Sequence, residues 1–325
     1  MALHPVFTQM IDAYRGSGRP QLCAGSPEDA RLLVAASRAA LGSGPKSCAV
    51  RDIRIPSRGG SIIGRFFTPV EPPLGLIVYA HGGGWVVGAL DDFDTLARTL
   101  VAHSGCALLL VDYRLAPEYP FPAGLEDVED AIRWAAASRL ELTGCHGSLI
   151  VAGDSAGANL VTVAALEIGR EVRLDLQVLF YPVTDTDTNT ASYQLYGDGY
   201  LLTKADMQWF LNHYVQGHAK ADPRIAPLRS EDVSGAPDTW IGIAEYDVLK
   251  DEGDAYAKRL AEAGVAVEHC RYSDMPHGFA RMTNLVDSAD RAVRDAANAI
   301  RRKCAPISAS APTRASSASQ GQHHG

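Results

Sequence analysis

The chain has 325 residues, of which 46% are hydrophobic and 21% charged, and its formal net charge is −8. This composition is typical of a globular protein of enzyme size with a large core. The acidic balance and the lack of a basic patch argue against nucleic acid as a partner, and no apolar run is long enough to cross a bilayer.

The two features of the chain that bear on its compartment are its first residues and its cysteines. The N-terminus has no basic region followed by an apolar stretch, so we expect no signal peptide. The six cysteines are scattered and none forms a Cys-x-x-Cys pair, which indicates free thiols in a reducing environment. These observations predict a cytoplasmic protein without stable membrane association.

The first quarter of the chain changes from helical to strand-like patterns. Residues 5–42 carry apolar residues at helical spacing and are punctuated by two Gly-Ser-Gly turns. Strand-like runs follow at 48–55, 61–67 and 75–80. We therefore expect helices first and then strands of a sheet that begins antiparallel.

Helices and strands alternate along the rest of the chain. The helical stretches are 93–103, 125–137, 156–168, 253–263 and 288–303, and the strand-like runs are 107–112, 148–152, 175–181, 239–244 and 266–272. An aromatic-rich segment with a helical stretch at 204–214 interrupts the alternation between residues 184 and 224. Alternation of this kind predicts a mostly parallel sheet with helices on both faces.

The run Gly153-Asp154-Ser155-Ala156-Gly157 stands between an apolar strand-like stretch and a helical stretch. Gly-x-Ser-x-Gly in this context is typical of a nucleophile elbow, in which a tight strand-to-helix turn exposes a serine hydroxyl. The pentapeptide alone also fits a glycine-rich turn with a solvated serine. The remainder of the chain decides between the two readings.

The run His81-Gly82-Gly83-Gly84-Trp85 directly follows a strand-like stretch. Glycines there can present backbone N–H groups without side-chain shielding, which favours an oxyanion hole completed by the N–H of Ala156. The alternatives are a flexible loop or a phosphate loop; no Gly-Lys-Ser/Thr follows, and the spacing does not match a dinucleotide fingerprint. We expect His81 to hold the loop and not to act as a base.

A serine nucleophile needs a base and an acid that orients it. His277, in Pro-His-Gly-Phe after the last strand-like run, fits the base, and Asp247, just past the run 239–244, fits the acid. The competing carboxylates are Asp251, which we interpret as a helix N-cap, and Asp274, which we interpret as a turn residue. The order Ser155, Asp247, His277 is that of α/β-hydrolases.

Taken together, these motifs resemble the hormone-sensitive-lipase family of carboxylesterases, the bacterial family IV. The resemblance spans roughly residues 45–303 and is carried by residues 81–84, 112–118, 153–157, 247–253 and 277–279. It implies Ser155 as nucleophile, His277 as base, Asp247 as acid, and the N–H groups of Gly83, Gly84 and Ala156 as the oxyanion hole. Family members usually have Pro where this chain has Val248, a difference that we assign to turn preference.

The fold implied is an eight-stranded, mostly parallel α/β-hydrolase sheet with a helical cap. We expect the cap to consist of residues 1–45 and 185–224, the core of 46–184 and 225–305, and the segment 306–325 to be a disordered tail. Apolar residues of the loop and cap suggest a substrate pocket or, alternatively, the small core of the cap itself. These residues are Trp85, Leu201, Leu202, Trp209 and Phe210.

The function predicted from the residues and the resemblance is hydrolysis of short- to medium-chain carboxylic esters through an acyl-enzyme. Two alternatives stay open: hydrolysis of amides, carbamates or lactones with the same residues, and non-catalytic ligand binding on the same fold. The predicted partner is a small ester, a homodimer is left open, and we expect neither a cofactor nor a metal.

Overall fold

The structure is a computed structural model that describes residues 2–18 and 20–305. The tail predicted for residues 306–325 lies outside the described residues.

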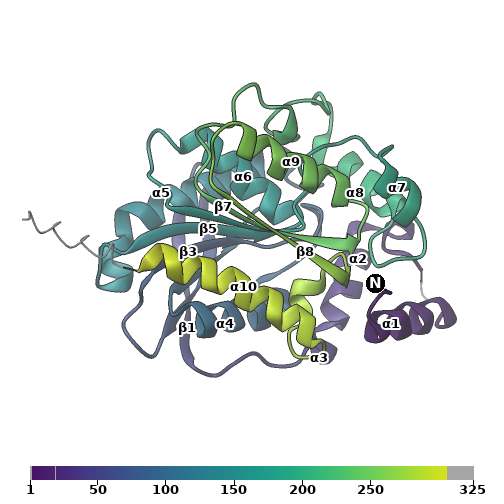
Figure 1. Cartoon of the computed structure of the whole chain (residues 1–325), viewed down its shortest axis with the longest axis horizontal. Helices are drawn as coiled ribbons and strands as arrows, with labels where there is room; N and C mark the ends of the chain where they lie inside the picture. The colour runs from purple at the N-terminus through teal and green to yellow at the C-terminus, as the bar shows by residue number, and fades with distance from the viewer. Residues whose placement is uncertain (1, 19, 306–325) are drawn as a thin grey trace, which may run out of the picture.

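An eight-stranded sheet forms the centre of the molecule (Figure 1). Its strands are β1 (Cys48–Ser57), β2 (Gly60–Pro69), β3 (Gly75–Ala80), β4 (Ala107–Asp112), β5 (Ser148–Asp154), β6 (Leu176–Phe180), β7 (Thr239–Tyr246) and β8 (Val267–Pro276). They lie in the order β1-β2-β4-β3-β5-β6-β7-β8. Among the described residues, the pairings β1–β2 and β2–β4 are antiparallel, and the other five pairings of the sheet are parallel. The predicted eight-stranded, mostly parallel sheet is confirmed.

Helices cover both faces of this sheet. One face carries α4 (Leu90–Ser104) and α10 (Asp287–Cys304), and the other carries α5 (Ala123–Thr143), α6 (Ala156–Ile168) and α9 (Lys250–Glu262) (Figure 1). The side chains of β3 show the consequence, because Leu76, Val78 and Ala80 pack into one apolar cluster and Ile77 and Tyr79 into the other. Both faces of a central parallel strand are therefore buried, as its uninterrupted apolar sequence requires.

The N-terminal segment and the inserted segment lie together at one end of the sheet (Figure 1). The first contains α1 (Pro5–Gly16), η1 (Leu22–Ala24), α2 (Pro27–Ala36) and α3 (Arg38–Leu41), and the second contains α7 (Ala191–Tyr196) and α8 (Lys204–Val215). Two hydrogen bonds join them: Cys23 N–H donates to Asp206 Oδ1 at 3.1 Å, and Arg15 donates to the carbonyl of Gly199 at 3.1 Å. The division of the chain into a cap and a core stays a prediction.

Two local assignments made from the sequence are wrong. Asp251 is not an N-cap, because α9 begins at Lys250 with Leu249 in the cap position, and the Asp251 carboxylate instead accepts the N–H of Ser192 at 2.8 Å. Asp274 is not in a turn, because β8 runs on to Pro276 in parallel pairing with β7. Two short 3₁₀ turns, η2 (Pro227–Arg229) and η3 (Phe279–Met282), complete the elements.

Candidate active site

Ser155 occupies a sharp turn between β5 and α6. Its backbone has φ +54°, a conformation that is unfavourable for a residue with a side chain. The turn is fixed by close backbone packing: the N–H of Ser155 donates to the carbonyl of Phe180 at 2.9 Å, and a Cβ on Gly157 would collide with the carbonyl oxygen of Ala80 in β3. Glycine is therefore required where the start of α6 crosses β3, and the serine is held at the carboxyl end of the sheet.

The structure brings Ser155, His277 and Asp247 together from the ends of three strands. His277 Nε2 lies 2.9 Å from Ser155 Oγ, and His277 Nδ1 lies 2.7 Å from Asp247 Oδ2. When Nδ1 carries the ring proton and donates it to Asp247, Nε2 is free to accept the hydroxyl proton of Ser155. The three side chains thus form a continuous hydrogen-bonded line.

Burial and neighbouring groups hold this line in place. Asp247 is only 2% exposed, and its second oxygen, Oδ1, accepts the N–H of Leu249 at 2.9 Å. The imidazole of His277 packs against the ring of Tyr181, with ring centroids 4.7 Å apart. Asp247 is therefore restrained through both carboxylate oxygens, and His277 is restrained through both nitrogens and one ring face.

The glycine loop after β3 presents backbone donors beside this line. Gly83 and Gly84 have φ +118° and +57°, and the N–H groups of Val86 and Val87 close the turn by donating to the carbonyl of Gly83. Within the described residues, no hydrogen bond occupies the N–H of Gly83, Gly84 or Ala156. These are the donors that the sequence predicts for an oxyanion hole, and they are available to a ligand.

Asp154 ties the start of the glycine loop to the elbow. Its buried carboxylate accepts the N–H of Gly82 and the hydroxyl of Tyr79, both at 2.9 Å. Burial raises the pKa of Asp154, whereas the hydrogen bond from Tyr79 and the nearby positive charge of Arg281 lower it. Because Asp154 directly precedes Ser155, one short segment positions both the serine and the first residue of the loop.

His81 has the surroundings of a residue that holds the loop. It is fully buried, its ring stacks on Phe93 and Tyr113 with centroids 5.0 and 4.5 Å away, and its Nδ1 lies 2.7 Å from the carbonyl of Gly82. Burial lowers the pKa of His81 to about 4, so the ring is neutral at neutral pH. These contacts agree with the structural role predicted for it.

The residues predicted to bind substrate have different surroundings. Trp85 and Phe210 are buried and contact parts of the protein: Trp85 stacks on Tyr214, and the ring of Phe210 faces Gly84 so closely that a Cβ there would collide with it. Leu202 is buried, Trp209 is partly buried, and Leu201 is 36% exposed. Substrate contact by any of the five stays a prediction.

Three residues that contact the site or its glycine loop have no sequence motif that predicts a role for them. Asp154 stands at a variable position of the Gly-x-Ser-x-Gly pattern, so the pattern gives it no role. Tyr181 follows β6, and Tyr214 lies on α8, and neither has a motif of its own. Only the position of Tyr181 at the carboxyl end of a predicted parallel strand could have marked it, because ligand sites gather at that edge.

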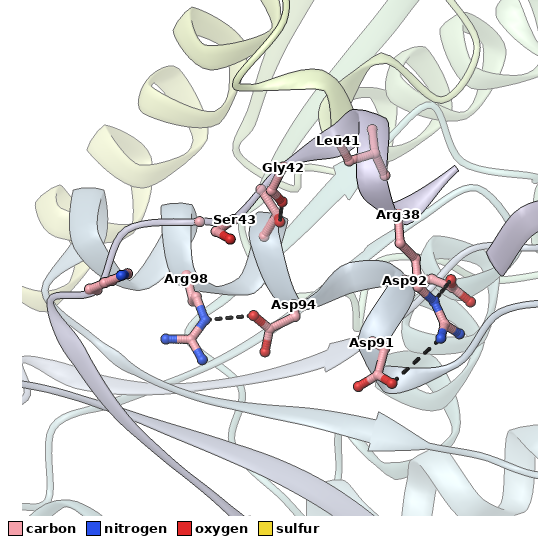
Figure 2. Close-up of a pocket in the computed structure, with 11 residues that line it drawn as sticks. Arg38, Leu41, Gly42, Ser43, Asp91, Asp92, Asp94 and Arg98 are labelled. Carbon is pink, nitrogen blue, oxygen red and sulfur yellow. Dashed lines mark hydrogen bonds and ion pairs between the residues drawn. The ribbon is translucent and has the colours of Figure 1, made fainter. Parts of the chain in front are cut away.

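A polar cavity of about 430 Å³ lies apart from these residues, between the segment around residues 38–46 and α4 (Figure 2). Arg38 pairs with Asp91 at 3.5 Å and Asp92 at 2.6 Å, and Arg98 pairs with Asp94 at 2.6 Å. None of Ser155, Asp247 and His277 lines this cavity. Arg38 and Arg98 are thus paired with carboxylates of the same cavity.

Among the helices of the described residues, none has the length and apolar character needed to span a membrane.

Comparisons with known proteins place the chain in a family. A family model described as the alpha/beta hydrolase fold matches residues 77–281. Two curated relatives are an ethyl acetate hydrolase of Pseudomonas putida, 35% identical over 89% of this chain and 96% of the relative, and the carboxylic ester hydrolase LipN of Mycobacterium tuberculosis, 38% identical over 78% and 70%.

Esterases are also found among the solved structures that resemble this chain. A thermostable esterase from Pseudomonas putida is 32% identical, with a TM-score of 0.89, over 94% of this chain and 98% of that one. A hyperthermophilic esterase from the archaeon Pyrobaculum calidifontis is 33% identical, with a TM-score of 0.87, over 93% and 99%. The similarity therefore extends over nearly the whole chain.

Proposed function

The chain belongs to the α/β-hydrolase family, of the hormone-sensitive-lipase type, and from this premise we propose that it is a serine carboxylesterase. The observation that carries the proposal is the hydrogen-bonded line from Ser155 through His277 to Asp247. Beside this line, the N–H groups of Gly83, Gly84 and Ala156 donate no hydrogen bond to another described residue. The names of the relatives, which include ethyl acetate hydrolase and carboxylic ester hydrolase, support the same reaction.

In the first half of the proposed reaction, Ser155 Oγ attacks the ester carbonyl and His277 Nε2 accepts the hydroxyl proton. The negative charge of the tetrahedral intermediate is stabilised by the N–H groups of Gly83, Gly84 and Ala156. The imidazolium then donates its proton to the leaving alcohol, and an acyl-Ser155 ester remains. Asp247 stabilises the imidazolium and fixes the ring tautomer throughout.

In the second half, a water molecule attacks the acyl-enzyme and His277 accepts its proton. The same backbone donors stabilise the second oxyanion. Collapse of this intermediate releases the carboxylic acid and returns the proton to Ser155 Oγ. The cycle closes with the chain in its starting protonation state, and none of its steps calls for a cofactor or a metal.

We propose short and medium acyl chains, roughly C2 to C8, as the preferred substrates. Each methylene buried in a pocket adds about 0.8 kcal/mol to the binding free energy until the pocket is full. The additional methylenes of a longer chain then remain exposed to solvent. The segments predicted to form the cap are short, since α7 has 6 residues and α8 has 12. An ethyl acetate hydrolase among the relatives supports a small substrate.

The compartment, the oligomeric state and other possible activities are also proposals. The six cysteines are all free thiols, which favours a reducing compartment such as the cytoplasm, and a homodimer stays a prediction. Hydrolysis of amides, carbamates or lactones would use Ser155, His277 and Asp247 in the same way. A protein that only binds a ligand would not use them for catalysis.

The test is a panel of p-nitrophenyl esters from C2 to C16, assayed with the wild-type protein and with Ser155→Ala. We expect turnover that is highest between C2 and C8, and a kcat lower by roughly 10⁴- to 10⁶-fold in Ser155→Ala with the fold retained. Turnover that survives in pure, folded Ser155→Ala would contradict the mechanism. Efficient hydrolysis of emulsified long-chain triglyceride would contradict the substrate class.

A further inference from the structure

The glycine loop ends in a residue whose backbone is strained. Trp85 has φ +61°, in the left-handed region that large side chains avoid. A backbone of this kind persists only where surrounding contacts restrain it. Contacts of Trp85 with the rest of the protein therefore prevent the loop from relaxing.

The main contact is a parallel stack on Tyr214 of α8. The two rings have centroids 4.3 Å apart and an interplanar angle of 3°, and both side chains are 1% exposed. Tyr214 is fixed in turn, because its carbonyl accepts the N–H of Phe121 at 2.9 Å. The carbonyl of Trp85 accepts the N–H of Ala116 at 2.9 Å. The strained residue is thus held through its ring and its carbonyl.

A second contact comes from the same helix face. Phe210 lies four residues before Tyr214, so the two side chains lie on one face of α8. The ring of Phe210 occupies the space beside Gly84, where a Cβ would collide with it. Two aromatic rings of α8 therefore cover two consecutive residues of the loop, Gly84 and Trp85.

Two further contacts of the loop restrain Gly82 and Gly83. Asp154 restrains the N–H of Gly82, and the hydrogen bonds from Val86 and Val87 to Gly83 are internal to the loop. None of these contacts covers Gly84, whose N–H is one of the predicted donors, or the ring of Trp85. Phe210 and Tyr214 of α8 lie against these two residues.

We propose that Tyr214, together with Phe210, is a positioning residue for the oxyanion loop. By stacking on Trp85 and covering Gly84, α8 holds the loop in the strained backbone that directs the N–H groups of Gly83 and Gly84 toward the substrate oxygen. Donors that are oriented before the reaction need no reorganisation as charge develops. This inference rests on the proposed esterase function. In this inference, Trp85 and Phe210 support the oxyanion hole.

The test compares Tyr214→Leu, which removes the stack, with Tyr214→Phe, which keeps it. The measurements are kcat and KM for p-nitrophenyl butyrate, together with the inhibition constant of an alkyl trifluoromethyl ketone, whose hemiketal oxygen mimics the oxyanion. Tyr214→Phe should stay within about twofold of wild type. Tyr214→Leu should lower kcat by about 10- to 100-fold, change KM little, and weaken the ketone by a similar factor.

Leu211→Ala is the matched control, because Leu211 is equally buried on α8 but is the next residue after Phe210 and so lies on a different face. It should lower Tm while leaving kcat and ketone affinity unchanged. If Tyr214→Leu lowers only Tm, as this control does, or lowers kcat without weakening the ketone, the proposal is overturned.

Phe210→Leu gives a second test in case Tyr214→Leu does not fold. It removes the ring that faces Gly84 and keeps an apolar side chain, so we expect a smaller loss of kcat with a matching loss of ketone affinity. Unchanged values for both would overturn the proposal. Failure of the underlying function is distinguishable, since wild-type protein would then neither hydrolyse the ester nor bind the ketone.

Discussion

The two regions that would surround a substrate carbonyl are held in place in different ways. The elbow at Ser155 is set by backbone packing within the sheet, where Gly157 touches β3 and the serine N–H bonds to β6. The loop at Gly83 and Gly84 is set by side chains from elsewhere, namely Asp154, Phe210 and Tyr214. The nucleophile side is therefore specified by nearby residues of the core, and the oxyanion side by a helix more distant in sequence.

The largest expected effect lies on the nucleophile side. Asp247→Asn should lower kcat by about 10⁴-fold, because an amide no longer fixes the tautomer of His277. Asp251→Asn should cost far less, since its carboxylate contacts Ser192 and not the imidazole. Steady-state kinetics on one ester decide between them. If Asp251→Asn shows the greater loss of kcat/KM, Asp247 is not the acid.

The next effect concerns the backbone of the elbow. Gly157→Ala should lower the free energy of unfolding by about 4 kcal/mol, because its Cβ would force α6 away from Ala80. Urea unfolding measures the change. Gly235→Ala is the control, since a Cβ there meets nothing within 4 Å, and it should be nearly neutral. Equal stability of the two variants would show that the elbow is not set by this contact.

The elbow and the glycine loop also differ in how far they could be predicted from the sequence. The central strands and the elbow were predictable, since uninterrupted apolar runs indicate buried parallel strands and Gly-x-Ser-x-Gly indicates a specific turn. The support of the glycine loop was not, because Trp85 and Tyr214 are far apart in the chain and no local pattern links them.

The wrong assignments of Asp251 and Asp274 have a similar cause. Both rested on local preferences for caps and turns. The turn before α9 instead uses Asp247, whose Oδ1 accepts the N–H of Leu249. The end of β8 is set by its pairing with β7, in which Tyr246 is opposite Pro276. Tertiary pairing overrode the local signal in each case.

A pH-dependent effect is expected on the oxyanion side. Burial lowers the pKa of His81 to about 4, below its value of about 6.5 in an unfolded chain. The unfolded state therefore binds the proton first as the pH falls, and stability is lost through this interval. His81 should contribute a loss of about 2 kcal/mol in unfolding free energy between pH 7 and pH 5.

Chemical denaturation at several pH values tests this prediction in wild type and in His81→Gln, which cannot titrate. The variant should be less stable at pH 7 but should lose less stability on acidification. Parallel pH profiles for the two proteins would show that His81 is not the group responsible.

The smallest expected effect is a change in ester chain-length preference, caused by substitution of Trp209 next to Phe210. Trp209 is partly buried beside Phe210, with ring centroids 5.3 Å apart. If it lines the acyl pocket, Trp209→Ala should change the ratio of kcat/KM between C4 and C8 esters by about 4-fold, the equivalent of roughly one buried methylene. Leu195→Ala, at a 67% exposed position on α7, should leave the ratio unchanged. An unaltered ratio in Trp209→Ala would exclude it from the pocket.

The most direct test of the central claim is to locate the covalent intermediate. Wild-type protein is treated with a p-nitrophenyl alkylphosphonate, which reacts with an activated serine and leaves a stable tetrahedral adduct, and is then digested and analysed by mass spectrometry. The account predicts one phosphonyl group per chain, on Ser155, with loss of esterase activity in step with labelling, and no label in Asp247→Asn over the same period. A label on another residue that accompanies the loss of activity, or full activity in protein labelled at Ser155, would contradict it.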